Sequence, residues 1–324
     1  MTAFTRRQVI GNAALAAAIG VLPDALQAAA PLAGRQAPAF YRYRIGAYEL
    51  TAVYDGIWLR DIDQSFVRNT PWPTVQQAMQ DAQMPPGKLP IPFTSLIVNT
   101  GSKLVLIDTA TGGQLAATAG SFGANLAAAG IDPKQVDIIL ISHFHPDHIN
   151  GIKTKDNEIV FPNAEIKVAA AEWAYWMDDA NMAKVAEAAR PTWLNVRRIF
   201  KDIAGKVEKF EPNREVAPGI TALAAPGHTP GHTVFAIASE SQSMLALGDT
   251  TNNPLLFVRH PDWQAVIDTD GPLAAETRKG LLERAAVDRM LVQGYHFPFP
   301  ASGHIIRTGA GSYDLVPVLW QPSL

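Results

Sequence analysis

The sequence predicts a single α/β domain, and three observations support this prediction. Short apolar runs that are typical of buried strands alternate along the chain with segments of helical pattern. Hydrophobic residues make up 48% of the 324 residues, enough for a large core, and no break in composition divides the chain after residue 40. Histidines and aspartates follow several of the apolar runs directly. A functional site is therefore expected where strands end, at one rim of a sheet.

The first half of the domain is expected to consist mainly of strands. Residues 60–92 are polar and rich in proline, which favours an extended loop around a short helix. Gly130 is placed to end a helix, and a continuous apolar run before residue 142 indicates a strand buried on both faces. The predicted elements are strands Tyr41–Arg44 and Tyr48–Tyr54 before a turn at Asp55-Gly56, a hairpin of Thr94–Asn99 and Lys103–Asp108, a helix Leu115–Ala129 and a strand Val136–Ile141.

The second half is expected to repeat this order of strands and helices. Residues 170–200 have a helical pattern that is rich in Trp and Tyr. Glycine-containing turns follow the later apolar runs, at 226–232, at Gly248 and at Gly294. The predicted elements are strands Ile220–Ala224, Thr233–Ala238 and Met244–Leu247, a helix near Leu273–Val287 and a last strand Met290–Gln293.

Residues 1–30 have the pattern of an export signal. Arg6 and Arg7 precede a short, weakly apolar run from Ala13 to Leu22, and small residues follow around Ala28. This order is typical of a removable signal peptide, and the paired arginines indicate the twin-arginine type. The apolar run is too short for a stable membrane span. We therefore expect a signal peptide over 1–30, a linker over 31–39, a domain over 40–324, and a periplasmic or secreted mature protein.

Composition excludes several functional classes. The formal net charge of −3 gives no electrostatic basis for binding nucleic acid, so no such partner is expected. The chain has no cysteine, which excludes disulfides, thiolate ligands for zinc and a cysteine nucleophile. A metal site in this chain must therefore use histidine and carboxylate ligands.

A cluster of potential metal ligands follows the apolar run before residue 142. The string Ser142-His143-Phe144-His145-Pro146-Asp147-His148 holds three of the eight histidines of the chain. His143 and His145 stand two residues apart, so an extended backbone directs both imidazoles to one side. Pro146 changes the direction of the chain, so that Asp147 and His148 can face elsewhere. Four such ligands exceed the needs of one tetrahedral catalytic ion, which indicates two metal ions.

Three further residues are placed to complete such a site. His228 lies in the turn Pro226-Gly227-His228-Thr229-Pro230-Gly231-His232, where glycines let the backbone bend and bring the imidazole inward. Asp249 follows the run Ala246-Leu247-Gly248 and, as a short anion, is suited to bridge two cations. His296 follows the last predicted strand and would complete the shell of the second ion.

In combination these motifs resemble the metallo-β-lactamase superfamily over residues 40–320. The resemblance rests on the 143–148 string with Gly151, the turn at 226–232, the segment Leu247-Gly248-Asp249 and the late His296. Within the superfamily, the chain is most similar to the branch of methyl parathion hydrolase and related exported lactonases and arylesterases. The cues for that branch are the segments 48–52, 98–109, 161–164 and 303–305. Ala110 departs from the pattern, which commonly has Gly after Thr109.

The resemblance implies a four-layer αββα sandwich with a dinuclear metal site. The ions are expected to be zinc, with manganese, iron or cobalt as alternatives. Asp147 and Asp249 are the implied catalytic carboxylates, and Asp147 would accept a proton when a metal-bridging hydroxide attacks. A homodimer is compatible with the resemblance. The first ion would be held by His143, His145 and His228, the second by Asp147, His148 and His296, and both by the bridging Asp249.

The expected function is hydrolysis of a small-molecule ester, namely a lactone or an aryl ester, with organophosphate triesters as a further class. The two ions would supply hydroxide at neutral pH and stabilise the oxyanion that forms. No acid suited to protonating a poor leaving group is evident, which disfavours amides. Two alternatives stay open: a β-lactamase-type hydrolase, and a metal-binding protein without catalysis on the same scaffold.

Several other side chains have two interpretations each. His232 would orient a ligand or only shape its turn, and Asp108 would support a ligand histidine or only cap a strand. His304 would line the pocket or serve the structure, and His260 is expected at the surface. The aromatic residues would wall a substrate pocket or belong to the core. These are Trp173, Tyr175, Trp176, Trp193, Phe93, Phe297 and Phe299.

Overall fold

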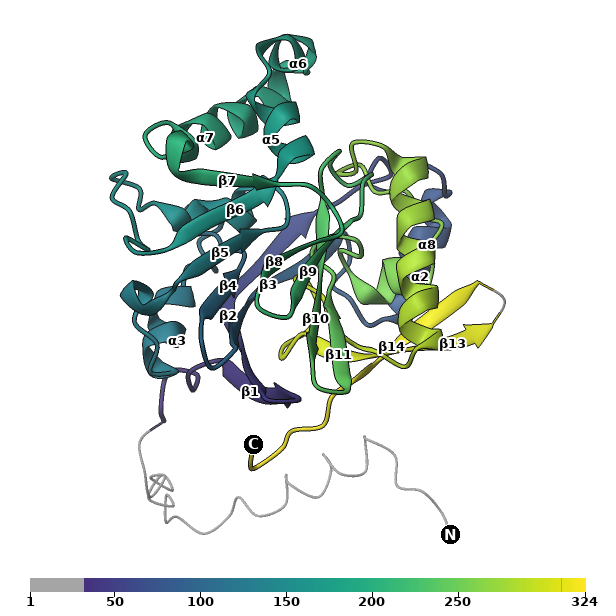
Figure 1. Ribbon diagram of the computed structural model, residues 1–324. Coiled ribbons are helices and arrows are strands. Elements are labelled where there is room, and N and C mark those ends of the chain that lie inside the picture. The colour runs from purple at the N-terminus through teal and green to yellow at the C-terminus, as the bar shows by residue number, and fades with distance from the viewer. Residues whose placement is uncertain (1–31, 310) are drawn as a thin grey trace, which may run out of the picture. The chain divides into compact units, whose positions relative to one another are not determined.

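Two seven-stranded sheets form the framework of the chain. The structure is a computed structural model that describes residues 32–309 and 311–324. The main compact unit spans Pro38–Leu324. Its first sheet runs in the order β1 to β7 and its second in the order β14 to β8 (Figure 1). The strands of the first sheet are β1 Phe40–Ile45, β2 Tyr48–Asp61, β3 Lys88–Asn99, β4 Leu104–Ile107, β5 Ile138–Ile141, β6 Glu165–Ala169 and β7 Val207–Phe210. Those of the second are β8 Arg214–Ala217, β9 Ile220–Ala224, β10 Thr233–Ser239, β11 Gln242–Ala246, β12 Leu291–Gln293, β13 Ser302–Gly309 and β14 Ser312–Pro317.

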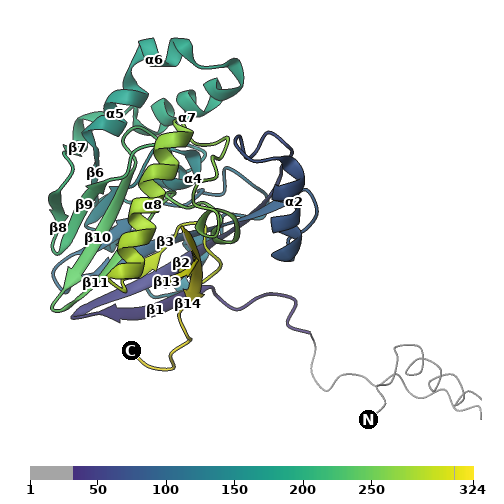
Figure 2. The same cartoon turned by 90° about the vertical axis from the view of Figure 1, so that its right-hand side faces the viewer.

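Helices lie on the outer faces of both sheets, so that the expected four-layer αββα order is confirmed (Figures 1 and 2). Helix α3 packs against β1 and β2, whereas α8 packs against β13. Helical structure over residues 170–200 is also confirmed. No helix of the described residues is long and apolar enough to cross a membrane. The helices are α2 Trp72–Asp81, α3 Phe122–Ala128, α4 Pro146–Ile149, α5 Ala170–Met177, α6 Asp179–Lys184, α7 Arg190–Phe200 and α8 Gly271–Val287.

Strand β5 sets the position of the predicted ligand loop. It lies between β4 and β6, is parallel to both, and all four of its residues are buried. The core between the sheets includes Leu140 from β5 and Phe235 from β10. Because hydrogen bonds and packing hold this strand on every side, its carboxyl end is a firm base for the segment that follows. The expected signal peptide, residues 1–30, lies outside the described residues.

The predicted turn at Asp55-Gly56 is wrong, because β2 continues through it to Asp61. The register with β3 shifts between Tyr54 and Gly56, which marks a β-bulge. A side chain on Gly56 would collide with the main chain of Thr118 and Ala119. The buried Asp55 carboxylate accepts hydrogen bonds from the main-chain N–H of Gly120 and Phe122. These two residues therefore anchor a neighbouring loop instead of ending a strand.

The same loop shortens the helix predicted over Leu115–Ala129. Helix α3 begins only at Phe122, because the preceding residues bond to Asp55, and it ends before Gly130 as expected. The expected loop over 60–92 is also partly wrong, although it contains helix α2. Pro90 and Pro92 belong to β3. Both pair with β2 on one side of β3, whereas on the other side β4 pairs only with residues 96–99, so no described strand takes an N–H from them at that edge.

Candidate metal centre

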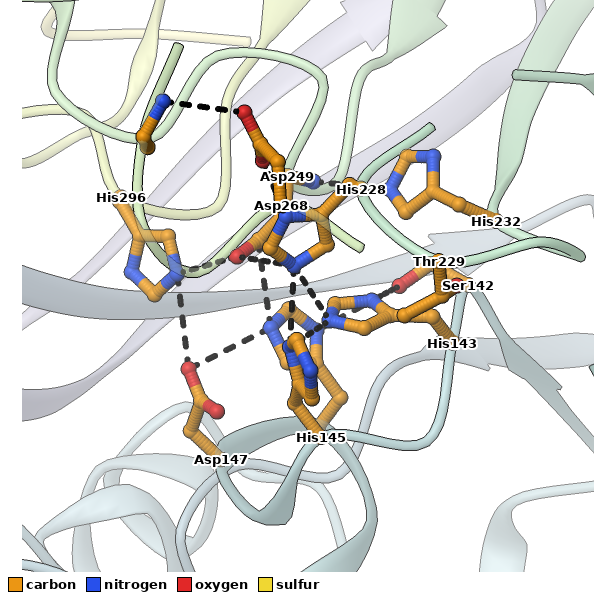
Figure 3. Close-up of polar contacts among 12 residues, drawn as sticks. Ser142, His143, His145, Asp147, His228, Thr229, His232, Asp249, Asp268 and His296 are labelled. Carbon is orange, nitrogen blue, oxygen red and sulfur yellow. Dashed lines mark hydrogen bonds and ion pairs between the residues drawn. The ribbon is translucent and has the colours of Figure 1, made fainter. Parts of the chain in front are cut away.

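Side chains that suit a metal ion gather at one rim of the sandwich, where several strands end (Figure 3). The loop after β5 leads into α4, and the segments after β9, β11 and β12 approach it from the second sheet. The structure brings together all seven residues that the sequence singled out. Two groups could each hold an ion, with ligand atoms within 4.8 Å of one another. They are His143, His145, His228 and Asp249, and Asp147, His148 and His296.

Three imidazoles of the first group point at one another. His228 Nε2 lies 2.9 Å from His145 Nδ1 and 3.2 Å from His143 Nε2. His143 Nε2 and His145 Nδ1 are 3.0 Å apart. A carboxylate oxygen of Asp249 lies 3.4 Å from His228 Nε2. Four potential ligand atoms thus converge on one small space.

The second group surrounds Asp249 from the other side. His148 Nε2 lies 3.3 Å from Asp147 Oδ2 and 3.2 Å from Asp249 Oδ1. His296 Nε2 lies 3.4 Å from Asp147 Oδ2 and 3.0 Å from Asp249 Oδ2. Asp249 therefore touches residues of both groups, in the position that a bridging carboxylate needs.

The two groups differ in their electrostatic environment. Burial, together with the neighbouring imidazoles, lowers the pKa of His143 well below its ordinary value and that of His145 to about 3. For His148, burial also opposes the charged form, but the carboxylates of Asp147 and Asp249 raise its pKa well above the usual value. The pKa of His296 is raised in the same way, mainly by Asp249. The surroundings of His143 and His145 thus favour the neutral imidazole, whereas those of His148 and His296 favour the charged form.

The donor atoms fit divalent cations. His228 Nδ1 hydrogen-bonds to the Asp268 carboxylate, and its Nε2 faces the other two imidazoles. His148 similarly hydrogen-bonds to Asp108 through Nδ1. Its Nε2 and the Asp249 Oδ1, 3.2 Å apart, are both buried and form no hydrogen bond within residues 32–309 and 311–324. Imidazole nitrogens and carboxylate oxygens that converge at these distances are the ligands that divalent cations such as zinc bind, so the residues present fit two such ions.

Asp108 supports the loop after β5. Its Oδ2 accepts from His148 Nδ1 at 2.8 Å and from the Ser142 hydroxyl at 2.7 Å, while its Oδ1 accepts from the Ser142 N–H. Of the two interpretations of Asp108, support of a histidine is the one observed. Of the two interpretations of His232, support of a ligand is the one observed: its Nε2 accepts from the Asp249 N–H at 3.0 Å. It therefore holds the turn that carries the predicted ligand Asp249.

Asp268 is a residue of the site that sequence reasoning missed. Its Oδ1 accepts from His228 Nδ1 at 2.9 Å, and its Oδ2 lies 3.4 Å from Arg278 Nη2. Arg278 is itself buried and donates to the carbonyl oxygens of Thr250, Pro261 and Trp263. This chain of contacts fixes the orientation of the His228 ring. No motif marks Asp268, which lies 40 residues beyond its partner.

Glu172 is the second residue that was missed, and it links the two halves of the site. One carboxylate oxygen accepts from the Phe144 N–H at 2.9 Å and from Trp176 Nε1 at 2.7 Å. The other accepts from the Thr229 hydroxyl at 2.7 Å and from the Gly231 N–H at 3.0 Å. Glu172 is fully buried, so these four donors replace its hydration. The loop of His145 and the turn of His228 are therefore tied to the same carboxylate.

A cavity of about 560 Å³ opens above Asp147, Asp249 and His296. Of the candidate aromatic residues, Tyr175, Trp176, Trp193 and Phe93 line it. Trp173 instead packs on Phe144 and Phe200, and Phe297 belongs to the core of the second sheet. His304 is exposed and lies outside this cavity, with its Nδ1 3.2 Å from the carbonyl oxygen of Met290, and Phe299 lies outside the cavity as well. His260, expected at the surface, is half-buried because its ring stacks on Trp263.

Comparison with known proteins agrees with this architecture. The family described as Metallo-beta-lactamase superfamily matches residues 90–296. An N-acyl homoserine lactonase of a Bacillus species is 30% identical over 123 residues, which cover 38% of this chain and 41% of the lactonase. The chain spans about half the length of the curated relatives it matches.

Two solved structures resemble the chain over most of its length. A hydrolase in the β-lactamase superfamily has a TM-score of 0.82 at 26% identity, over 89% of this chain and all of the other. A dizinc quorum-quenching lactonase, solved in complex with the product N-hexanoyl-L-homoserine, also has a TM-score of 0.82 at 26% identity. That match covers 87% of this chain and 98% of the lactonase.

Proposed function

The chain belongs to the metallo-β-lactamase superfamily, and from that premise we propose that it is a dinuclear metal-dependent hydrolase of lactones. One observation carries the proposal: seven buried or nearly buried histidines and aspartates form two adjoining ligand groups at the floor of an apolar-walled cavity. The likeness to a dizinc lactonase over nearly the whole chain supports the substrate class. Two divalent cations are proposed as the cofactor, with zinc as the first candidate.

The side chains divide the work between binding and proton transfer. His143, His145 and His228 would hold one cation; Asp147, His148 and His296 would hold the other; Asp249 would contact both. When bound, the cations supply Lewis acidity and lower the pKa of a coordinated water to about 7. Asp147 lines the cavity, and its side chain is 13% exposed, so its free oxygen Oδ1 can accept a proton from the cavity side. Tyr295 holds the Asp147 main chain in place by donating its hydroxyl to the carbonyl oxygen at 2.6 Å.

The cavity wall suits an acyl group. Tyr175, Trp176 and Trp193 stand together with Trp58 and Ile91 around the space above the ligands. Their apolar surfaces exclude water and would bind a hydrocarbon chain beside the reacting carbonyl. Aryl esters and organophosphate triesters are proposed as further substrates, because the same side chains serve attack at carbon and at phosphorus.

The decisive experiment is a substrate panel on metal-quantified protein. Wild-type protein with zinc is assayed on N-acyl lactones, aryl esters and phosphotriesters, with and without a chelator. We expect turnover that is fastest on a lactone, lost with chelator and restored by zinc. His228→Ala is expected to lose metal and activity, whereas His304→Ala, at an exposed histidine outside the site, is expected to keep both. Two bound ions without turnover on any substrate would reject the hydrolase and leave a metal-binding protein.

Export is proposed separately from the catalytic function. The twin-arginine pattern at residues 6–7 supports a periplasmic or secreted mature protein. Fractionation of cells that express the full chain is expected to find the protein outside the cytoplasm, and Arg6→Lys with Arg7→Lys is expected to retain it inside. The same distribution of the wild type and the double variant between the fractions would reject twin-arginine export.

A further inference from the structure

The cavity above the ligand groups contains two arginines in different states. Arg68 donates to the carbonyl oxygens of Val266 at 2.8 Å and Asp268 at 3.2 Å, so its hydrogen bonds hold the neighbouring loop. Arg60, near the end of β2, also lines the cavity. Within residues 32–309 and 311–324, its side chain forms neither a hydrogen bond nor an ion pair. Arg60 therefore has donors available for a ligand.

Aromatic faces hold the Arg60 guanidinium in place. Its central carbon lies 5.3 Å from the centre of the Trp58 ring and 5.6 Å from that of Phe66. Contacts of this kind leave the N–H edges of a guanidinium free, because the rings attract its face. Arg60 is half-buried, and its nitrogens are not among the buried polar atoms that lack a hydrogen-bond partner, so water reaches them. A carboxylate in the cavity could take the place of that water.

Asp147 is an acidic residue of the same cavity, but it already contacts other side chains. No ion pair joins it to Arg60 in the part of the chain that the structure describes. Asp147 Oδ2, however, lies within 3.4 Å of both His148 Nε2 and His296 Nε2 in the second ligand group. A cation held there would take up the charge of Asp147. The guanidinium would then remain without a counter-charge.

We propose that Arg60 binds a carboxylate that the substrate carries at a distance from its reacting ester. The proposal rests on the hydrolase function proposed above, and it narrows the substrate class to lactones or esters with an apolar spacer that ends in a carboxylate. The spacer would lie along Ile91 and Phe93, which line the same cavity. The planar guanidinium can grip a carboxylate with two parallel hydrogen bonds, which a neutral carbonyl oxygen cannot accept in the same way.

Ligand binding tests this proposal without requiring turnover. Linear dicarboxylates of four to ten carbons and the monocarboxylates of the same lengths are titrated calorimetrically into the zinc-loaded protein. Both series offer one carboxylate to the metal centre, so the difference reports the second one. At the best length, the dicarboxylate is expected to bind at least about tenfold more tightly. Arg60→Gln is expected to remove this difference, and Arg60→Lys to retain part of it because the charge remains.

Arg44→Gln is the matched control, since it removes one positive charge from an exposed position outside the cavity. It is expected to leave the difference unchanged. Equal binding of the two series by the wild type, or a difference that survives in Arg60→Gln, would overturn the proposal. An absence of hydrolysis with the binding difference intact would reject the hydrolase and leave the role of Arg60 standing. Hydrolysis without any difference in binding between the two series would support the hydrolase and overturn the role proposed for Arg60.

Discussion

The two halves of the metal centre are built by different means. The first sheet supplies His143, His145, Asp147 and His148 from one loop, which Asp108 and the end of β5 hold. The second sheet supplies residues far apart in the chain, and each has its own partner. His228 is held by Asp268, Asp249 by His232, and His296 by the carbonyl oxygen of Pro92. A site can thus combine a compact motif with scattered residues, provided that buried contacts place the latter.

The largest effect is expected where the two halves meet, at Asp249. Asp249→Asn removes the charge that contacts His148, His228 and His296. Because loss of a supporting residue alone costs 10–100-fold in such sites, we expect more than about a hundredfold loss of activity and less than two ions per chain. Activity and metal content are measured together. Asp288→Asn, at an exposed aspartate, is the control. Wild-type activity and metal content in Asp249→Asn would show that Asp249 is not part of the metal centre.

A smaller effect is expected at the supporting carboxylates. Asp268→Asn and Asp108→Asn each weaken the hydrogen bond that orients one histidine, His228 or His148. We expect each to lower metal affinity by about 10–100-fold, as is typical of residues behind a ligand. Competition with a zinc chelator measures both variants. If Asp108→Asn lowered metal affinity and Asp268→Asn did not, the position of His228 would not depend on its buried partner Asp268.

At Glu172 the expected effect is mainly on stability. Glu172→Gln places an amide NH₂ where two donors already point, so two of its four hydrogen bonds are lost. A buried donor left unsatisfied costs about 1–3 kcal/mol, and we expect a loss of roughly 2–4 kcal/mol in the free energy of unfolding. Urea denaturation of the zinc-free protein measures it. The exposed Glu187→Gln should change it by less than about 0.5 kcal/mol. An equal change in the free energy of unfolding in Glu172→Gln and Glu187→Gln would show that Glu172 does not join the two halves of the site.

The smallest effect is expected when Glu172 loses a single donor. Trp176→Phe removes the Nε1 hydrogen bond of 2.7 Å and keeps most of the apolar wall of the cavity. We expect a loss of about 1 kcal/mol in the free energy of unfolding, the usual net value of one hydrogen bond. A loss as large as that of Glu172→Gln would mean that packing of the ring, not the carboxylate, dominates at this junction.

The compact half could be predicted from sequence because its geometry is local. Two histidines in extended backbone and a proline before Asp147 already fix where the side chains point. His228, Asp249 and His296 were found for another reason: each follows an apolar run, and strand ends meet at one rim. The layers of the fold followed from the resemblance of these motifs to a known family.

What could not be predicted depends on tertiary contacts without a local pattern. Glu172 looks like an ordinary helical residue until Phe144 and Gly231 approach it. Asp268 acts only through His228 and Arg278, which are distant in sequence. The Asp55-Gly56 pair satisfies the usual rule for a turn, but a bulge and the adjoining loop use it differently. In each case, buried hydrogen bonds with distant residues override the local preference.

The account rests on two metal ions held side by side by these seven residues. Anomalous scattering from crystals of the protein purified with zinc, collected on both sides of the zinc edge, tests this most directly. We predict two peaks per chain, one among His143, His145 and His228 and the other among Asp147, His148 and His296, with Asp249 in contact with both. A single peak, or none at this rim, would contradict the account.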